Sequence, residues 1–306
     1  MSLARTLLLR ASHSAWLAEQ LRRRRFVHRA VRRFMPGEDL ADALRAATDL
    51  AAGGIGSILT QLGENITSRA EADAVRDHYL GVLDQVRGRK LPAQVSVKLT
   101  QLWLDVDRAA CEASLRTLVA RAAEHGATLW IDMEDSTYAD VTLALFRKMR
   151  AETPHVGVAL QAYLRRTPAD LETLLPLAPT IRLVKGAYNE APSVAFPQKR
   201  DVDAQYETLA ATLLANTARG TRPVFGTHDL GLITRIRARA AELRAAPGSY
   251  EVHMLYGVRA AEQRALAAAG VPVKVLISYG RAWFAWYMRR LAERPANVWF
   301  VVRSLF

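Results

Sequence analysis

The chain has 306 residues, of which 50% are hydrophobic, so it can bury the core of one large domain or two small ones. Its net charge is +12, but no nucleic-acid-binding motif accompanies the basic residues, and no apolar run approaches the roughly 18 residues of a membrane span. The only cysteine, Cys111, excludes an internal disulfide and fits a reducing compartment, so we expect a cytoplasmic protein that binds no nucleic acid.

Residues 1–35 are predicted to form a separate basic amphipathic helical segment ahead of a catalytic barrel that spans residues 36–306. Apolar side chains in its helix, roughly Ser14–Phe34, lie beside a series of arginines, namely Arg22, Arg23, Arg24, Arg25, Arg29, Arg32 and Arg33. Such a helix can rest on the anionic inner face of the cell membrane as a peripheral contact. It can equally pack on the barrel or on a neighbouring subunit. The Arg-rich start also resembles a mitochondrial transit peptide, a weaker alternative, and a signal peptide is not expected.

Eight short β-type runs follow in chain order, and most are apolar on both faces, as strands buried on both sides should be. They are Gly56–Leu62, Gln94–Leu99, Thr128–Met133, Val156–Ala162, Ile181–Ala187, Pro223–His228, Tyr250–Leu255 and Val271–Ser278. Helical patterns lie between the runs, including Asp107–Gly126, Tyr138–Thr153, Asp201–Arg219 and Leu230–Ala245. This alternation predicts an α/β fold, a (β/α)8 barrel. An open doubly wound sheet is the competitor, but Gly53-Gly54-Ile55-Gly56 precedes a strand instead of following one.

Polar side chains collect where the predicted strands end, which is the edge of a barrel that carries its chemistry. They are Glu64, Lys98, Asp132, Glu134, Asp135, Gln161, Arg182, Lys185, Tyr188, Thr227, His228, His253 and Tyr256. Any one of them is compatible with a satisfied structural ion pair. Seven strands with the same feature indicate an active site, because an ionisable group in a barrel mouth is costly unless it is paired or used. Cys111 has no histidine or cysteine at metal-ligand spacing, so we interpret it as structural and expect no metal site.

The C-terminal helical pattern carries two adjacent arginines, Arg289 and Arg290, with Glu293 one turn further on. On spacing alone they are compatible with a solvated helix face and an ion pair. Four aromatic residues crowd the same helix, which favours a small-anion pocket, since a guanidinium grips a carboxylate with two parallel hydrogen bonds. They are Trp283, Phe284, Trp286 and Tyr287. The apolar tail, residues 298–306, is expected to cover the barrel or a subunit contact, so a homo-oligomer is possible.

The run Arg182-Leu183-Val184-Lys185-Gly186-Ala187-Tyr188 resembles the fifth-strand motif of proline dehydrogenases, particularly the monofunctional bacterial type. The resemblance extends from about residue 30 to the end, through motifs in the family's order. These are Leu62-Gly63-Glu64, Val97-Lys98-Leu99, Ile131-Asp132-Met133-Glu134, Gln161-Ala162-Tyr163, Thr227-His228-Asp229, Met254-Leu255-Tyr256-Gly257 and Arg289-Arg290-Leu291-Ala292-Glu293.

The resemblance implies a distorted (β/α)8, TIM-like barrel whose final helix holds the Arg-Arg pair over the mouth. It implies non-covalent FAD, oxidation of L-proline to Δ1-pyrroline-5-carboxylate as the first step of proline catabolism, and transfer of the electrons from the flavin to a membrane quinone. A pyrroline-5-carboxylate dehydrogenase would act on the product.

The resemblance also implies roles for individual residues. Arg182 would hydrogen-bond near flavin N5, and Gln161 would bind the isoalloxazine edge. The remainder of the cofactor would contact Lys185, Gly186, Thr227, His228 and Glu251. Glu293 would contact the cofactor or fix Arg290.

On the substrate side, the resemblance implies that Arg289 and Arg290 clamp the proline carboxylate. Glu64 would pair with Arg289 as a gate over the closed site. The rest of the substrate pocket would be shaped by Lys98, Asp132, Tyr188 and Leu255.

The chain departs from the family at three positions. The family usually carries tyrosine where Leu276 and Trp286 stand, and proline where Ser278 stands. The two tyrosines pack on the proline ring, so their replacement alters the shape of the pocket. A related flavin oxidoreductase acting on hydroxyproline or another cyclic or secondary amino acid is therefore an alternative to L-proline oxidation.

Two further interpretations belong to other classes of protein. Lys185 in the fifth strand could form a Schiff base as in a class I aldolase, with Asp132 or Glu134 as proton shuttle. The chain could also be a non-catalytic barrel that binds acidic partners through residues 16–33.

Overall fold

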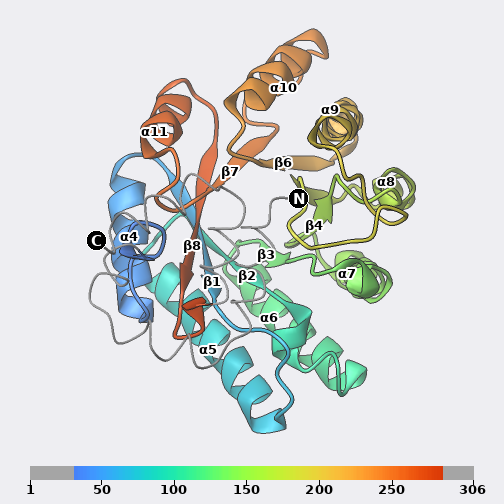
Figure 1. The fold of residues 1–306 in the computed structure, drawn as a ribbon. Coiled ribbons are helices and arrows are strands. Elements are labelled where there is room, and N and C mark those ends of the chain that lie inside the picture. The colour runs from blue at the N-terminus through green and yellow to red at the C-terminus, as the bar shows by residue number, and fades with distance from the viewer. Residues whose placement is uncertain (1–30, 285–306) are drawn as a thin grey trace, which may run out of the picture.

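The computed structural model describes residues 31–284, which form a closed barrel of eight parallel strands in sequential order (Figure 1). The strands are β1 (Gly56–Gln61), β2 (Ala93–Val97), β3 (Leu129–Ile131), β4 (Val156–Gln161), β5 (Thr180–Val184), β6 (Arg222–Gly226), β7 (Glu251–Leu255) and β8 (Val273–Tyr279). The ring closes because β1 pairs with both neighbours: Ser57 is in register with Ala93 of β2 and with Val275 of β8. All eight predicted strands are confirmed, and the closure excludes the open doubly wound sheet.

Helices surround the barrel, as Figure 1 shows. The α-helices are α4 (Leu40–Ala52), α5 (Arg69–Gly88), α6 (Arg108–Glu124), α7 (Ala139–Glu152), α8 (Thr167–Leu174), α9 (Lys199–Ala215), α10 (Leu230–Glu242) and α11 (Ala260–Ala268). Four short 3-10 turns accompany them, η1 (Leu99–Leu102), η2 (Ser136–Tyr138), η3 (Leu175–Leu177) and η4 (Thr217–Arg219). The four predicted helices correspond to α6, α7, α9 with η4, and α10.

Short polar side chains set where several helices begin. Asp107 accepts hydrogen bonds from the backbone N–H groups of Ala109 and Ala110 at the start of α6, at 2.9 and 3.0 Å. Asp229 does the same for Leu232 of α10 at 3.2 Å. Such caps satisfy the first backbone donors of a helix, which have no partner inside it. The caps therefore fix the places where the loops after β2 and β6 turn into helices.

Strand alternation separates two hydrophobic regions. Outward-facing strand residues such as Val95, Leu129 and Val275 belong to the large core between strands and helices. A smaller cluster fills the barrel interior, where Ile58, Trp130 and Val224 are buried and the half-buried Leu276 packs against them. Because side chains alternate along a strand, the residues two positions further on, such as Asp132, also face the axis of the barrel.

Several of our expectations concern residues outside the described part of the chain. The basic segment 1–35 is described only from residue 31. The helix with Arg289, Arg290 and Glu293, the altered position Trp286 and the apolar tail 298–306 all lie outside the described residues. Within residues 31–284, no helix is long and apolar enough to cross a membrane. Within the same residues, no cluster of metal-ligating side chains is found.

Candidate active site at the carboxyl edge of the barrel

The centre of the site is a chain of charges that crosses the barrel between β2, β3 and β5. Arg182 of β5 forms an ion pair with Asp132, which directly follows β3. Ser96 of β2 bridges them: its hydroxyl donates to Asp132 at 2.7 Å and accepts from Arg182 Nη2 at 2.9 Å. Lys98 Nζ lies 3.5 Å from the other Asp132 oxygen. Four residues from three strands are thus joined although up to 86 positions separate them in the sequence.

The charges in this chain hold one another in their ionised forms. Burial opposes ionisation of Asp132, but Arg182 and Lys98 bring the pKa of its carboxyl below the ordinary value. Burial alone would lower the pKa of Lys98, yet the nearby Asp132 raises it well above its usual range. Burial lowers the pKa of Arg182, against the pull of Asp132. A buried charge network with its partners in place is costly to break from either side.

Other predicted residues gather around Lys98. After Asp132, the groups that raise its pKa are Tyr188, Glu134 and Glu64, in that order. The three come from the loops after β5, β3 and β1, so the predicted substrate-side residues Glu64 and Tyr188 lie near Lys98 and Asp132. Glu134 is buried against Thr100, whose backbone N–H and hydroxyl both donate to it, at 3.2 and 2.8 Å. Burial raises the pKa of the Glu134 carboxyl, while Lys98 and Thr100 act in the opposite direction.

Gln161, the last residue of β4, presents a polar atom with unused hydrogen-bonding capacity. Its amide nitrogen donates to the backbone carbonyls of Met133 and Glu134 at 3.2 and 2.8 Å. Its amide oxygen is buried and has no hydrogen-bond partner among the described residues. A buried acceptor without a donor is costly. The geometry therefore fits a ligand that brings an N–H group to this position.

The loop after β5 approaches the loop after β4 closely at Gly186. This glycine has φ +114°, and a Cβ there would lie 2.2 Å from the ring of Tyr163. Only glycine allows this conformation and this contact. The backbone after β5 therefore packs directly on Tyr163 beside Gln161.

Lys185 contacts two carboxylates, at 2.5 Å from Asp203 of α9 and 2.9 Å from Asp229. Asp229 lies two residues after Thr227, whose hydroxyl accepts from the Asp229 backbone N–H at 3.2 Å. Lys185 holds the pKa of Asp229 down to about 2. Lys185 is held in ion pairs with both carboxylates, whereas a Schiff-base lysine must be free to attack a carbonyl carbon. The site therefore gives no support to the aldolase hypothesis.

The loops after β6 and β7 meet at His228. The backbone N–H of Leu255 donates to His228 Nε2 at 3.4 Å. Leu255 ends β7, is half-buried, and lies in register with Leu276 of β8. These contacts place Leu255 and Leu276 at the same level, on the side of the barrel opposite Asp132.

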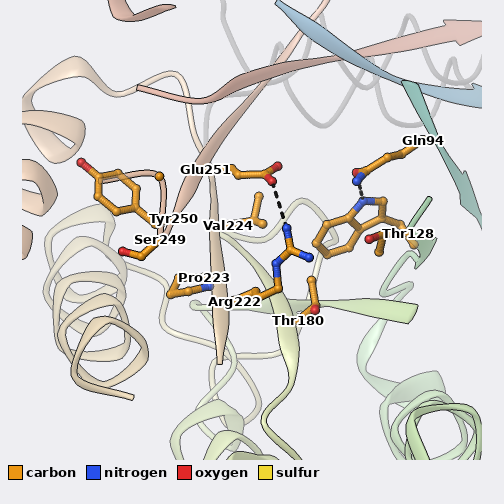
Figure 2. A pocket seen from close by; sticks show the side chains of 11 residues that line it. Gln94, Thr128, Thr180, Arg222, Pro223, Val224, Ser249, Tyr250 and Glu251 are labelled. Atoms are coloured by element: carbon orange, nitrogen blue, oxygen red, sulfur yellow. Dashed lines mark hydrogen bonds and ion pairs between the residues drawn. The ribbon is translucent and has the colours of Figure 1, made fainter. Parts of the chain in front are cut away.

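Glu251 is the predicted cofactor residue that the structure does not bring to this edge. It begins β7, at the opposite end of the barrel, and lines a pocket there with Arg222, the first residue of β6 (Figure 2). It pairs with Lys274 and accepts from His253 Nε2 at 3.1 Å. Although burial opposes ionisation, these partners bring the pKa of Glu251 down to about 2, whereas burial lowers the pKa of His253 to about 4. The predicted strand Tyr250–Leu255 already put Glu251 near its amino end, away from the edge that carries the chemistry, so the cofactor role came from the resemblance alone.

Two residues that no sequence pattern singled out lie one layer below Lys98 and Asp132. Ser96 and Trp130 lie two positions before Lys98 and Asp132 on their strands and are 0% and 1% exposed. The signal that could have found them is the twofold alternation of a strand, because a residue two positions before an inward-facing one also faces inward. Both contact Arg182, Ser96 by its hydroxyl and Trp130 by its ring.

Comparisons with known proteins point to a single family. A family model described as proline dehydrogenase matches residues 43–303. Proline dehydrogenase 1 of Bacillus subtilis subsp. natto is 34% identical over 90% of this chain and 90% of its own length. Proline dehydrogenase of Deinococcus radiodurans is 36% identical over 94% of this chain and 93% of its own length.

A solved structure of proline utilization A from Bdellovibrio bacteriovorus, inactivated by N-propargylglycine, shares the fold. Its TM-score is 0.81 at 24% identity, and the match covers 87% of this chain and 32% of that longer chain. The closed barrel, the charge chain across its carboxyl edge and the match over residues 43–303 lead to one conclusion. The chain belongs to the proline dehydrogenase family.

Proposed function

We propose that this protein oxidises L-proline to Δ1-pyrroline-5-carboxylate, using FAD and passing the electrons to a membrane quinone. The observation that carries the proposal is the Lys98–Asp132–Arg182 charge chain at the carboxyl edge of the barrel. The relatives that align over nine-tenths of the chain are named as proline dehydrogenases, which supports the substrate. In the reaction, the carbon next to the ring nitrogen loses a hydride and the nitrogen loses a proton, and a C=N bond forms.

The residues present fit a flavin. The isoalloxazine ring carries an imide N–H between two carbonyls, which matches the buried amide oxygen of Gln161 and its missing donor. FAD, when bound, supplies the two-electron acceptor for the hydride. We propose that Gln161 and Arg182 hold its ring and that the remainder of the cofactor lies along Lys185, Gly186, Thr227 and His228, with Glu293 as a further contact.

The chain's own residues would fix the substrate and the charge around it. Two arginines, Arg289 and Arg290, suit the carboxylate of proline because each offers a planar fork of donors. Clamping the carboxylate sets the distance of the reacting carbon, and small errors in that distance are costly to the rate. Lys98 and Asp132 would line the substrate side, Tyr188 and Leu255 would act as its walls, and Glu64 would close over it by pairing with Arg289.

Partners follow from the chemistry of the product and of the electrons. The product is an imine in equilibrium with a semialdehyde, so an enzyme of the pyrroline-5-carboxylate dehydrogenase class would consume it. A quinone acceptor is dissolved in lipid, and the basic segment 1–35 carries the charge to hold the protein against the cytoplasmic face of a membrane. We propose that residues 36–306 form the catalytic unit.

A second candidate substrate class rests on Leu276. This side chain faces the interior of the barrel beside Ile58, Trp130 and Val224, is half-buried, and carries no hydroxyl. It lies level with Leu255, one of the proposed substrate walls. A cyclic amino acid with a ring substituent, such as hydroxyproline, is therefore the alternative to L-proline.

The test is an absorbance spectrum of the purified protein before and after anaerobic addition of L-proline. Oxidised-flavin absorption that bleaches with L-proline is the expected result. Absorption that persists with L-proline but bleaches with hydroxyproline would move the assignment to the second substrate class. A protein that takes up no flavin even from excess FAD would overturn the proposal.

A further inference from the structure

Arg182 stacks on an aromatic platform that none of the proposed catalytic roles includes. Its guanidinium carbon lies 4.8 Å from the ring centroid of Trp130, within the range of a cation–π contact. Both side chains face the barrel interior, Trp130 from β3 and Arg182 from β5, and they are 1% and 5% exposed. Arg182 is thus held by Asp132 and Ser96 at one edge and by an indole face beneath it.

Trp130 is itself fixed on three sides. Its indole N–H donates to Gln94 Oε1 at 2.7 Å, a bond marked by a dashed line in Figure 2. The His253 ring meets it edge-on, with centroids 5.5 Å apart. On β4, a Cβ at Gly157 would lie 2.6 Å from the indole ring, so the backbone passes directly beside it. An indole held by a hydrogen bond, a ring contact and the adjacent backbone of Gly157 is restricted to a narrow range of positions.

The remaining donors of Arg182 explain why its position matters. Among the described residues, Asp132 and Ser96 both receive their hydrogen bonds from one terminal nitrogen, Nη2. A guanidinium has five N–H donors in a fixed plane, so the Nε and Nη1 protons are left for a ligand. The Nε and Nη1 protons lie in the plane of the guanidinium. The ring of Trp130, on which the guanidinium stacks, sets the orientation of that plane.

We propose that Trp130 is a positioning residue of the active site, which acts through Arg182 by fixing the plane and depth of its guanidinium. The inference rests on the proposed function, since it assigns to Arg182 a ligand in the barrel mouth. Replacement of the indole by a smaller aliphatic side chain leaves Arg182 charged and paired with Asp132 but free to tilt. Phenylalanine keeps an aromatic face and loses only the bond to Gln94.

Kinetics on three variants test the role. Trp130→Leu should lower kcat about tenfold to a hundredfold with little change in KM for L-proline. Trp130→Phe should recover most of that loss. The control is Phe225→Leu, which removes a fully buried aromatic ring from β6 on the outward-facing side of the barrel wall. A loss in Trp130→Leu no larger than in Phe225→Leu would reduce Trp130 to a packing residue and overturn the proposal.

A second measurement needs neither cofactor nor turnover. The Arg182 Nε–H signal can be identified in arginine-labelled protein by its disappearance in Arg182→Lys. Stacking on the indole shifts it upfield by ring current, and Trp130→Leu should remove that shift while Phe225→Leu leaves it. An Arg182 signal that does not move would contradict the contact. A wild-type protein that neither binds flavin nor oxidises proline would instead contradict the proposed function. The Arg182 Nε–H signal would still show whether Trp130 orients Arg182.

Discussion

The Gln161 side chain donates to the backbone carbonyl of Glu134 at 2.8 Å, which joins the end of β4 to the loop after β3. Its amide oxygen is left buried and without a donor among the described residues. Gln161→Leu should therefore weaken FAD binding by tenfold or more, since a good hydrogen bond in a dry site corresponds to about 1.5 kcal/mol. The dissociation constant of FAD from the apoprotein measures this.

A matched control exists for this variant. Gln205 of α9 also donates to two backbone carbonyls, those of Ala162 and Leu164, at 2.7 and 2.8 Å. Gln205→Leu removes the same kind of structural bond from the neighbouring loop without touching the Gln161 oxygen. Equal FAD affinities for the two variants would show that Gln161 has a purely structural role.

Asp132→Asn should destabilise the fold more than any surface charge change. It leaves the buried Arg182 without its counter-ion, which costs on the order of 3 kcal/mol. The exposed Asp84, which pairs with Arg121 on the surface, provides the comparison: Asp84→Asn should cost about 1 kcal/mol or less. Denaturant unfolding of both variants measures the difference. Similar unfolding free energies would mean that the charge chain across the barrel contributes little to stability.

Stability should fall on acidification between about pH 6.5 and pH 4 because of His253. The unfolded chain binds a proton on this side chain below about pH 6.5. Burial keeps the folded protein from doing so until about pH 4, although Glu251 favours the charged form and Arg182 and Lys274 oppose it. The unfolded state therefore binds more protons in this window, and the loss is on the order of 3 kcal/mol at most. Melting temperature against pH should flatten there in His253→Gln, and an unchanged slope would assign the loss to other groups.

Arg289→Met should raise KM for L-proline at least tenfold while flavin stays bound. The methionine keeps a long apolar side chain and removes the fork of donors that binds the carboxylate. Steady-state kinetics with the flavin spectrum recorded in parallel measures both. Arg235→Met, which removes a paired surface arginine of α10, is the control and should leave KM unchanged. If Arg289→Met has the same KM as the control, Arg289 does not bind the substrate carboxylate.

Leu276→Tyr should shift substrate preference. The substitution replaces an aliphatic side chain with an aromatic ring and a hydroxyl beside Ile58 and Trp130, at the level of Leu255. We expect the ratio of kcat/KM for L-proline over hydroxyproline to change by about tenfold, which is what a change in shape at one pocket wall typically produces. An unchanged ratio would place Leu276 outside the substrate pocket.

The barrel and most of the edge that carries its chemistry could be predicted from the sequence alone. Eight apolar runs separated by amphipathic stretches predict a parallel barrel surrounded by helices, because strands buried on both faces need helices to cover them. Lys98, Asp132, Gln161 and Arg182 were found because polar residues at the ends of buried strands conflict with the apolar pattern around them. The family motifs in their order gave the same residues.

Which of these residues contact one another depends on the closed barrel. Closure of the sheet brings Arg182 to Asp132 and Ser96 across the barrel, and no spacing along the chain encodes that distance. Trp130 looked like an ordinary core residue in a run of three apolar residues, and only the interior packing shows an indole beneath a guanidinium. A strand pattern fixes which face a side chain points to, whereas its partners depend on the seven other strands that share the same axis.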